Sequence, residues 1–360
     1  MKRVVVAMSG GVDSSVAACL LKEQGCEVIG VTMRTWGKGE DDRCNRCCGA
    51  ADVEDARRVA QQIGIPFYAV NLNEQFEREV VRYFCEEYER GRTPNPCILC
   101  NEKVKFGALL RKALDLKADL LSTGHYARLV LDEGSGRYLL KKGIDPRKDQ
   151  SYVLFSLTQE QLRLSLFPLG EYRKEEVRRK ALQMGLRVHD KAESQEVCFI
   201  QGPSYHSFLS QRLIDSIGPG PIIDKDGTIL GRHKGIPFYT VGQRRGLGLA
   251  KGKPLYVIGI DRERNAIIAG EERETYSETF IVDSLNWILP QDMNQSFPAQ
   301  VKIRYKHPGS EALLHPKGEG EVEVKFRTPQ KAVTPGQAAV FYDGDVVLGG
   351  GWIKEVRSSE

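Results

Sequence analysis

Hydrophobic and polar positions along the first 200 residues follow two periods, one typical of buried strands and one of amphipathic helices. Residues 3–8 form an apolar run of strand length, and residues 14–24 then repeat apolar side chains at helical spacing. The same alternation continues downstream. Further strands are predicted at 27–33, 67–70 and 119–122, and further helices at 50–62, 73–90, 103–116, 158–166 and 174–184. Strands separated by such helices predict βαβ units and a parallel sheet, so we expect an α/β fold.

The pattern changes near residue 218, beyond which glycine, proline and β-branched residues recur and long helical patterns disappear. Between residues 275 and 360 short alternating segments follow one another, for example at 299–305 and 321–326, and predict a small antiparallel barrel or sandwich. The expected domains are a catalytic α/β domain over 1–202, a central β-rich domain over 203–273 and a C-terminal β-barrel over 274–360.

Composition places the chain among ordinary globular proteins. It has 360 residues, of which 41% are hydrophobic and 28% charged, and this excludes wholesale disorder. The formal net charge of +4 permits an anionic partner without demanding one. No apolar run approaches the ~20 residues of a membrane helix. We therefore expect a cytoplasmic protein with no membrane partner. Its nine cysteines would be reduced there, and their number favours metal, redox or sulfur chemistry.

The strongest single motif is residues 8–15, which read Met-Ser-Gly-Gly-Val-Asp-Ser-Ser between the first strand and the first helix. Glycines let backbone N–H groups approach an anion, and the following helix N-terminus favours negative charge. We interpret Ser14 and Ser15 as caps of that helix. The bland alternative is an ordinary glycine-rich turn. The motif is neither a Walker A loop nor a Rossmann fingerprint, so it predicts a phosphate site of another kind.

Two cysteine motifs lie about 100 residues apart. Residues 91–101 read Gly-Arg-Thr-Pro-Asn-Pro-Cys-Ile-Leu-Cys-Asn, and residues 194–200 read Ser-Gln-Glu-Val-Cys-Phe-Ile. Cys100 is expected at the entrance to the next helix, where a thiol has a lowered pKa. Taken alone, the pair Cys97 and Cys100 fits a metal site, a redox pair or coincidence. Cys198 alone fits a buried core thiol as well as a reactive one.

Together these segments resemble one family. The phosphate motif resembles the PP-loop of ATP pyrophosphatases, which adenylate an oxygen of their substrate and release pyrophosphate. The whole ordered set resembles the bacterial tRNA-specific 2-thiouridylases over essentially the full chain. The further matching segments are residues 105–106, 123–127, 148–152, 167–170, 239–248 and 349–351.

The resemblance implies ATP-dependent 2-thiolation of the wobble uridine of tRNA. The uracil 2-oxygen would attack the α-phosphate of ATP. Cys198 would carry a persulfide sulfur from a cysteine desulfurase or a sulfur relay protein. Cys100 would be the nucleophile that releases this sulfur, leaving a Cys100–Cys198 disulfide. Asp13 would help to hold Mg²⁺ and pyrophosphate. The ATP-binding residues would be Ala7, Met8, Ser9, Gly10, Gly11, Val12, Asp13, Ser14, Met33 and Gly124.

Other matched positions would contact the anticodon arm of the tRNA or the target base, which must leave the base stack for the chemistry. They are Asn95, Pro96, Cys97, His125, Lys148, Asp149, Gln150, Arg304, Tyr305 and Gln337. For the positions that would touch the anticodon arm, the alternative is a surface polar residue or a solvated loop. A monomer bound to one tRNA is the default expectation.

Cys97 keeps a second sulfur mechanism open, because many relatives carry Asp at this position and others carry Cys. Three thiolates from Cys97, Cys100 and Cys198 would suit a [4Fe-4S] cluster with one open iron. The persulfide route needs two cysteines only and is favoured. Cys44, Cys47 and Cys48 form another group whose spacing suits zinc or a cluster, but no second motif completes four ligands, so we favour a structural or incidental interpretation.

Basic residues cluster at 173–180 and at Arg244 and Arg245, as RNA-contacting patches do. A solvated helix face balanced by glutamates is the alternative for the first cluster. Two other functions stay open: a PP-loop ligase or amidotransferase acting on a small molecule, and a catalytically silent RNA-binding protein. Pyrophosphate release that depends on added tRNA separates these from a thiouridylase.

Overall fold

The computed structural model describes residues 1–35, 50–192, 197–200, 205–213, 218–249 and 253–357. The chain divides into two compact units. The first contains Met1–Val81, Pro96–Gln201 and Asp345–Val347, and the second contains Arg82–Asn95, Gly202–Gly344 and Leu348–Glu360.

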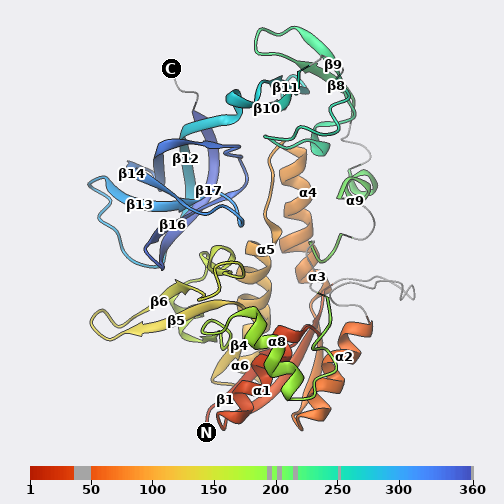
Figure 1. Cartoon of the computed structure of the whole chain (residues 1–360), viewed down its shortest axis with the longest axis vertical. Coiled ribbons are helices and arrows are strands. Elements are labelled where there is room, and N and C mark those ends of the chain that lie inside the picture. Colours follow the sequence, from red (N-terminus) through yellow and green to blue (C-terminus); the bar gives the residue numbers. More distant parts are fainter. Residues whose placement is uncertain (36–49, 193–196, 201–204, 214–217, 250–252, 358–360) are drawn as a thin grey trace. The chain divides into compact units, whose positions relative to one another are not determined.

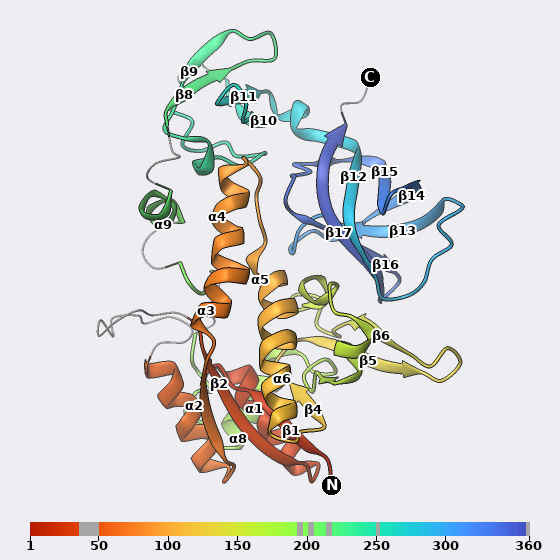
Figure 2. The ribbon, with the colours of Figure 1, turned by 180° about the vertical axis from the view of Figure 1, so that it is seen from behind.

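The first unit is built on a parallel sheet with strand order β3-β2-β1-β4-β7. Figure 1 labels β1 and β4 of this sheet, and Figure 2 labels β2 as well. Its strands are β1 (Arg3–Ala7), β2 (Glu27–Arg34), β3 (Phe67–Asn71), β4 (Leu120–Ser122) and β7 (Ser165–Leu166). In β1, Val4, Val5 and Val6 are all fully buried, as expected for a central strand covered on both faces. The main packing helices are α1 (Val12–Glu23), α2 (Ala50–Gln62) and α8 (Lys174–Gln183). Helices α1 and α2 pack against the sheet, α8 packs against α1, and Val16, Val59 and Val177 join one hydrophobic core with Val4 and Val6 of β1.

Two long helical segments in this part of the chain each contain a π-helical stretch between two α-helical ones. The first runs through α3 (Asn73–Phe76), the π-helical η1 (Glu77–Val81) and α4 (Arg82–Glu89). The second runs through α5 (Pro96–Leu99), the π-helical η2 (Cys100–Leu109) and α6 (Leu110–Asp115). The side-chain amide of Gln161 donates to the carbonyl oxygens of Glu102 and Phe106, which satisfies acceptors in the widened turn. The predicted helix at 103–116 is therefore too short, because the helical backbone begins at Pro96.

One other prediction for this unit is wrong, and one element was missed. Residues 158–166 are not one helix, because α7 (Gln159–Arg163) starts at a capping box on Thr158 and ends before β7. The hairpin of β5 (Ala127–Asp132) and β6 (Arg137–Lys142) was not predicted at all. A short helix η3 (Ser151–Leu154) follows it.

The second unit holds the β-rich segments, as predicted. Its mixed sheet has strand order β10-β11-β8-β9, made of β8 (Gly220–Ile223), β9 (Ile229–His233), β10 (Tyr256–Asp261) and β11 (Ala266–Gly270). It also contains α9 (Tyr205–Arg212), η4 (Ile236–Phe238) and η5 (Glu272–Thr275).

Six antiparallel strands then close into a barrel, because β12 pairs with β15 on one side and with β17 on the other (Figure 1). They are β12 (Tyr276–Trp287), β13 (Phe297–Lys302), β14 (Ser310–Gly318), β15 (Glu321–Lys331), β16 (Ala338–Asp343) and β17 (Val346–Arg357). Phe280, Phe326 and Phe341 fill the barrel. The predicted fold class, a parallel α/β domain followed by β-rich and β-barrel segments, is confirmed. The exact domain limits at 202/203 and 273/274 stay a prediction.

Candidate functional site

The phosphate motif forms the connection between β1 and α1, at the carboxyl end of the sheet. The side chains of Met8 and Val12 are buried in the core, so the loop presents mainly backbone groups to a ligand. Gly11 is the residue before the helix, and the first N–H groups of α1 have no carbonyl partner within the helix. Together with the partial positive charge of the helix N-terminus, these N–H groups make an anion site.

Ser14 and Ser15 do not cap α1 as predicted. They lie inside its first turn, and their hydroxyl groups donate back to the carbonyl oxygen of Gly11 at 3.2 and 2.9 Å. The hydroxyl of Ser14 also accepts the backbone N–H of Ser9 at 3.1 Å. The serines therefore stiffen the loop from within, and the N–H groups at the helix start are left for a ligand.

A second set of contacts fastens the loop from outside. The ammonium of Lys191 donates to the carbonyl oxygen of Gly10 at 3.1 Å and to the carboxylates of Asp52 and Asp55 at 2.7 and 2.6 Å. Gly10 has a φ of +73°, and a Cβ there would meet the carbonyl oxygen of Asp52 at 2.2 Å. Only glycine fits this close approach to the start of α2.

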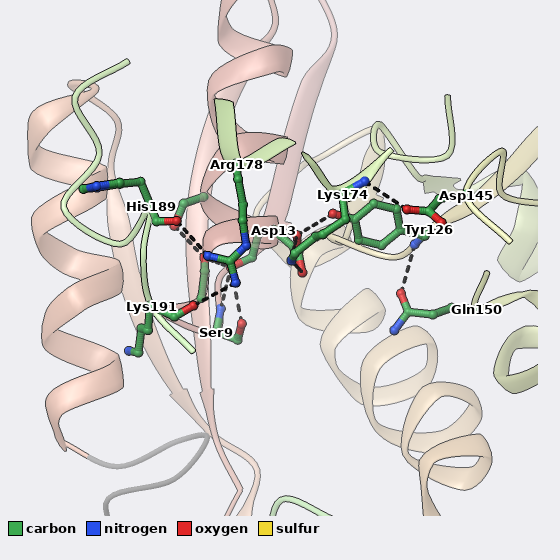
Figure 3. A network of polar contacts seen from close by, with 12 residues as sticks. Ser9, Asp13, Tyr126, Asp145, Gln150, Lys174, Arg178, His189 and Lys191 are labelled. Carbon is green, nitrogen blue, oxygen red and sulfur yellow. Dashed lines mark hydrogen bonds and ion pairs between the residues drawn. The ribbon is translucent and has the colours of Figure 1, made fainter. Parts of the chain in front are cut away.

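Asp13, the predicted Mg²⁺-binding residue, is bound to a buried lysine. The ammonium of Lys174 donates to both carboxylate oxygens at 2.6 and 2.8 Å, and the hydroxyl of Tyr126 donates to Oδ1 at 2.6 Å. Asp145 accepts the backbone N–H of Lys174 at 3.1 Å and so holds the start of α8 (Figure 3). Only 7% of the Lys174 side chain is exposed. Within the described residues no group of three or more acidic, His or Cys side chains is arranged to hold a metal ion.

The basic cluster at 173–180 therefore does not form one RNA-facing surface. Lys174 faces the phosphate loop, and the guanidinium of Arg178 donates to the carbonyl oxygens of His189 and Lys191 (Figure 3). Arg173 and Arg179 are exposed. Sequence reasoning missed the role of Lys174, because its helical position alone does not separate an inward lysine from an outward one.

Gly124 and Met33 are the other predicted ATP contacts. A Cβ on Gly124 would lie 2.8 Å from the backbone nitrogen of Ser14, so this residue packs directly on the first turn of α1. Met33 is half-buried near the end of β2. Met33 lies near the end of β2, and Gly124 follows the end of β4. Both of these parallel strands end at the edge of the sheet where the phosphate loop lies, so the predicted ATP residues are brought to one edge.

The Cys97–Cys100 turn opens the helical segment α5–η2. Since the helix begins at Pro96, Cys97 lies in its first turn, and Cys100 is the first residue of the π-helical stretch. Cys100 is thus not at the helix entrance, contrary to the prediction. Cys97 as a whole residue is exposed. Protein groups around its sulfur nevertheless desolvate the thiolate, and this raises the pKa of the thiol. The positive charge of Lys105 lowers that pKa in part.

Cys198 lies in a short described segment, 197–200, in the same unit. Its neighbour Phe199 is buried and packs edge-on against Phe76, with ring centres 5.7 Å apart. Among the cysteines of the described ranges, Cys97, Cys100 and Cys198 form no disulfide. They are not gathered into a set that could hold a metal, so the described side chains do not fit a cluster site. Cys44, Cys47 and Cys48 lie outside the described residues.

His125, a predicted tRNA contact, is 7% exposed and lies next to Lys105. Its Nδ1 is 2.7 Å from the hydroxyl of Thr123, and its Nε2 is 3.5 Å from the ammonium of Lys105. Burial lowers the pKa of His125 well below its ordinary value, and Lys105 acts in the same direction. The imidazole is therefore neutral at pH 7, and both of its nitrogens face protein groups.

The predicted tRNA turn at residues 148–150 is held by its own side chains. Asp149 accepts the backbone N–H groups of Gly143 and Ser151 at 3.2 and 3.0 Å. Gln150 accepts the backbone N–H of Tyr126 at 2.9 Å (Figure 3). These two residues give the turn its shape, and Lys148 beside them is half-buried.

The remaining predicted tRNA residues belong to the second unit. Arg304 is exposed and donates to the carbonyl oxygen of Lys331, and Tyr305 beside it is half-buried. The side-chain amide of Gln337 donates to the carbonyl oxygens of Thr93 and Pro94 at 2.8 and 3.3 Å. Gln337 thus supports the loop that leads to Asn95. Arg244 and Arg245 are exposed, and their contact with RNA stays a prediction.

No helix in the described part of the chain is long and apolar enough to cross a membrane. Three family models match successive parts of the chain. They are a tRNA methyl transferase HUP domain over residues 2–202, a tRNA methyl transferase PRC-barrel domain over 206–271 and an aminomethyltransferase beta-barrel domain over 277–353.

Curated relatives match at full length. The tRNA-specific 2-thiouridylase MnmA 1 of Caldanaerobacter subterraneus subsp. tengcongensis is 53% identical over 360 residues, which cover 99% of each chain. The tRNA-specific 2-thiouridylase MnmA of Halothermothrix orenii is 52% identical over 357 residues, again 99% of each chain. That of Symbiobacterium thermophilum is 52% identical and covers 98% of this chain and 92% of its own. This chain therefore belongs to the tRNA-specific 2-thiouridylase family.

Proposed function

We propose that this chain catalyses ATP-dependent 2-thiolation of the wobble uridine in the tRNA anticodon. The observation that carries the proposal is the combination of a backbone-lined phosphate loop and the Cys97–Cys100 turn in one unit of a chain half identical to tRNA-specific 2-thiouridylases. The HUP-domain match accounts for the use of ATP, and the relatives account for tRNA as the substrate.

The first step is adenylation of the base. ATP enters with Mg²⁺ as part of the substrate, and the loop N–H groups and the start of α1 bind its phosphates. The uracil 2-oxygen forms a bond to the α-phosphorus, the bond to pyrophosphate breaks, and the N3 proton is released. Lys174 keeps the Asp13 carboxylate in one orientation beside the loop. A role of Asp13 in binding Mg²⁺ would require it to exchange its lysine partner for the ion.

The second step transfers sulfur. Cys198 carries a persulfide from the sulfur donor, and the thiolate of Cys100 attacks its inner sulfur. A Cys100–Cys198 disulfide forms and hydrosulfide leaves. The hydrosulfide adds to C2 of the base, the C2–O bond breaks, and AMP departs with the bonding electrons. In the direct variant the terminal persulfide sulfur attacks C2 before Cys100 acts. A thiol reductant then restores both cysteines.

The [4Fe-4S] route is the weaker proposal, because the described cysteines are not gathered into a ligand set. The surface for the anticodon arm is proposed to include Arg304, Tyr305 and the exposed pair Arg244 and Arg245. A cytoplasmic location, a monomeric enzyme and a cysteine desulfurase or relay protein as sulfur donor complete the proposal.

The test is anaerobic thiolation of unmodified tRNA with ATP and a cysteine desulfurase. The wild-type protein is compared with Cys97→Ala, Cys100→Ala and Cys198→Ala. Thiolated tRNA is detected by retardation on a mercury gel, and iron is assayed in parallel. The persulfide route predicts that Cys100→Ala and Cys198→Ala give no product, while Cys97→Ala still gives some and no iron is needed. Activity that tracks iron and all three cysteines would establish the cluster route. A wild-type protein inactive with every sulfur donor would refute the function.

A further inference from the structure

Lys105 holds a half-buried positive charge whose partners are uncharged. Its ammonium donates to the side-chain oxygen of Asn101 at 2.9 Å and lies 3.5 Å from Nε2 of His125. Among the described residues, no carboxylate is within ion-pair distance of it. Lys103, two residues earlier, is the contrast, since its side chain is 50% exposed and pairs with Glu102 at 2.5 Å.

Both partners of Lys105 are fixed by bonds of their own. Asn101 is 1% exposed, and its amide nitrogen donates to the carbonyl oxygen of Val153 at 2.9 Å, so its oxygen is aimed at Lys105. An ammonium can only donate, so Nε2 of His125 is the acceptor and Nδ1–H donates to Thr123. Among the residues that the structure describes, these two contacts use two of the three ammonium protons and leave one for an acceptor on the reactants.

Lys105 is connected to both the phosphate loop and the cysteine turn. His125 directly follows Gly124, which packs on the backbone of Ser14 in the first turn of α1. On the other side, the charge of Lys105 acts on the thiol of Cys97. Lys105 thus contacts the residue that follows Gly124, and its charge lowers the pKa of the Cys97 thiol.

Lys105 is only half-buried, so the neutral acceptors Asn101 and His125 replace part of the hydration of its ammonium, whereas a purely structural lysine is normally paired with a carboxylate or left in water. Rigid neutral acceptors that position the charge without neutralising it are the arrangement that electrostatic catalysis requires. A positively charged group held in this way would attract an anionic group of the reactants.

We infer that Lys105 is a further catalytic residue, which binds the anionic phosphate of the adenylyl group where the base is activated and where AMP departs. The inference rests on the proposed function. No bond to Lys105 forms or breaks. Its charge stabilises the negative charge on the phosphate oxygens while the bond to pyrophosphate breaks, and again while the C2–O electrons move to AMP.

The experiment measures pyrophosphate release by the full-length protein with ATP and an unmodified tRNA transcript, without a sulfur donor. Lys105→Met removes the charge and keeps the length, Lys105→Arg keeps the charge, and Lys103→Met is the matched control for net charge. We expect Lys105→Met to lower kcat about 100-fold, the effect typical of losing one such donor, with a much smaller change in KM. Lys105→Arg should recover most of the rate, and Lys103→Met should stay within about threefold of the wild type, as exposed charges do.

The outcomes separate the possibilities. The inference is overturned if Lys105→Met releases pyrophosphate at the wild-type rate, or if it loses only the sulfur-transfer step. In the second case the lysine serves the cysteines alone. A wild-type protein that releases no pyrophosphate with tRNA would remove the proposed function and this inference together. Thermal melting checks that each variant is folded, and Lys105→Gln replaces Lys105→Met if the latter does not fold.

Discussion

The phosphate loop and the Cys97–Cys100 turn lie in the same unit but are held in different ways. Around the loop, Lys174 and Lys191 are fully paired with carboxylates, and serine hydroxyls bond the backbone from within. At the cysteine turn, Cys97 is exposed and the nearby ammonium of Lys105 has neutral partners. The difference indicates that carboxylates neutralise the cations around the phosphate loop, whereas the positive charge of Lys105 beside the cysteine turn is held by neutral groups.

Breaking the Asp13–Lys174 ion pair beside the phosphate loop should give the largest loss of stability and of pyrophosphate release. Lys174→Met leaves Asp13 facing Tyr126 without its cation, and we expect roughly 1–3 kcal/mol of lost stability and about 100-fold slower tRNA-dependent pyrophosphate release. Chemical denaturation and a pyrophosphate assay measure the two effects.

The double variant Asp13→Asn with Lys174→Met removes both charges and serves as the control. It should recover stability toward the wild type while the rate stays low, because the loss of rate comes from the site and not from unfolding. Full activity in Lys174→Met would show that this pair does not serve the ATP site.

A smaller effect is expected where the backbone packs closely. Gly124→Ala places a methyl group 2.8 Å from the backbone nitrogen of Ser14, and backbone cannot give way as a flexible side chain can. We expect a loss of about 1–3 kcal/mol in stability and a KM for ATP raised roughly tenfold. Gly134→Ala is the matched control, since the nearest atoms to its Cβ are 3.9 Å away. Equal behaviour of the two variants would contradict the packing argument.

The smallest expected effect is on the rate at which Cys97 is alkylated and on the pH dependence of that rate. Because the pKa of the Cys97 thiol is raised, its alkylation by iodoacetamide should be slow near pH 7 and should accelerate as pH rises toward that pKa. Lys105 lowers this pKa, so Lys105→Met should raise it further and slow alkylation about threefold at a fixed pH. Cys97 and Cys100 share one tryptic peptide, so fragment ions that separate the two cysteines are used to follow the alkylation of Cys97. Faster alkylation in Lys105→Met would reverse the predicted sign.

Periodicity and turn residues predict most of the fold. The apolar run at β1, the helical repeat of α1 and the short alternating strands of the barrel each carry a clear pattern. The helix start at Pro96 was missed because the prolines at 94 and 96 favour an extended loop, although proline is also common at the first helical position. The β5–β6 hairpin was missed although alternating residues flank Gly134 and Gly136, a signal strong enough to have found it.

The residues of the candidate site likewise divide into those that the sequence identifies and those that only the fold reveals. The phosphate motif and the cysteines are local signals, so the sequence identifies them. Lys174, Lys191 and Lys105 act through partners that are distant in the chain, such as Asp13, Asp52 and His125. Only the fold brings these groups together, and a single sequence does not show which of 52 basic residues turn inward.

We propose that one unit carries two separable steps, adenylation by the phosphate loop and sulfur transfer by Cys100 and Cys198. The most direct test measures pyrophosphate and thiolated tRNA in the same reaction, with the wild type and with Cys100→Ser. If the two steps are separable, Cys100→Ser still releases pyrophosphate with added tRNA, at close to the wild-type initial rate, and makes no thiolated tRNA. Loss of both products in Cys100→Ser, or thiolated tRNA made without Cys100, would contradict it.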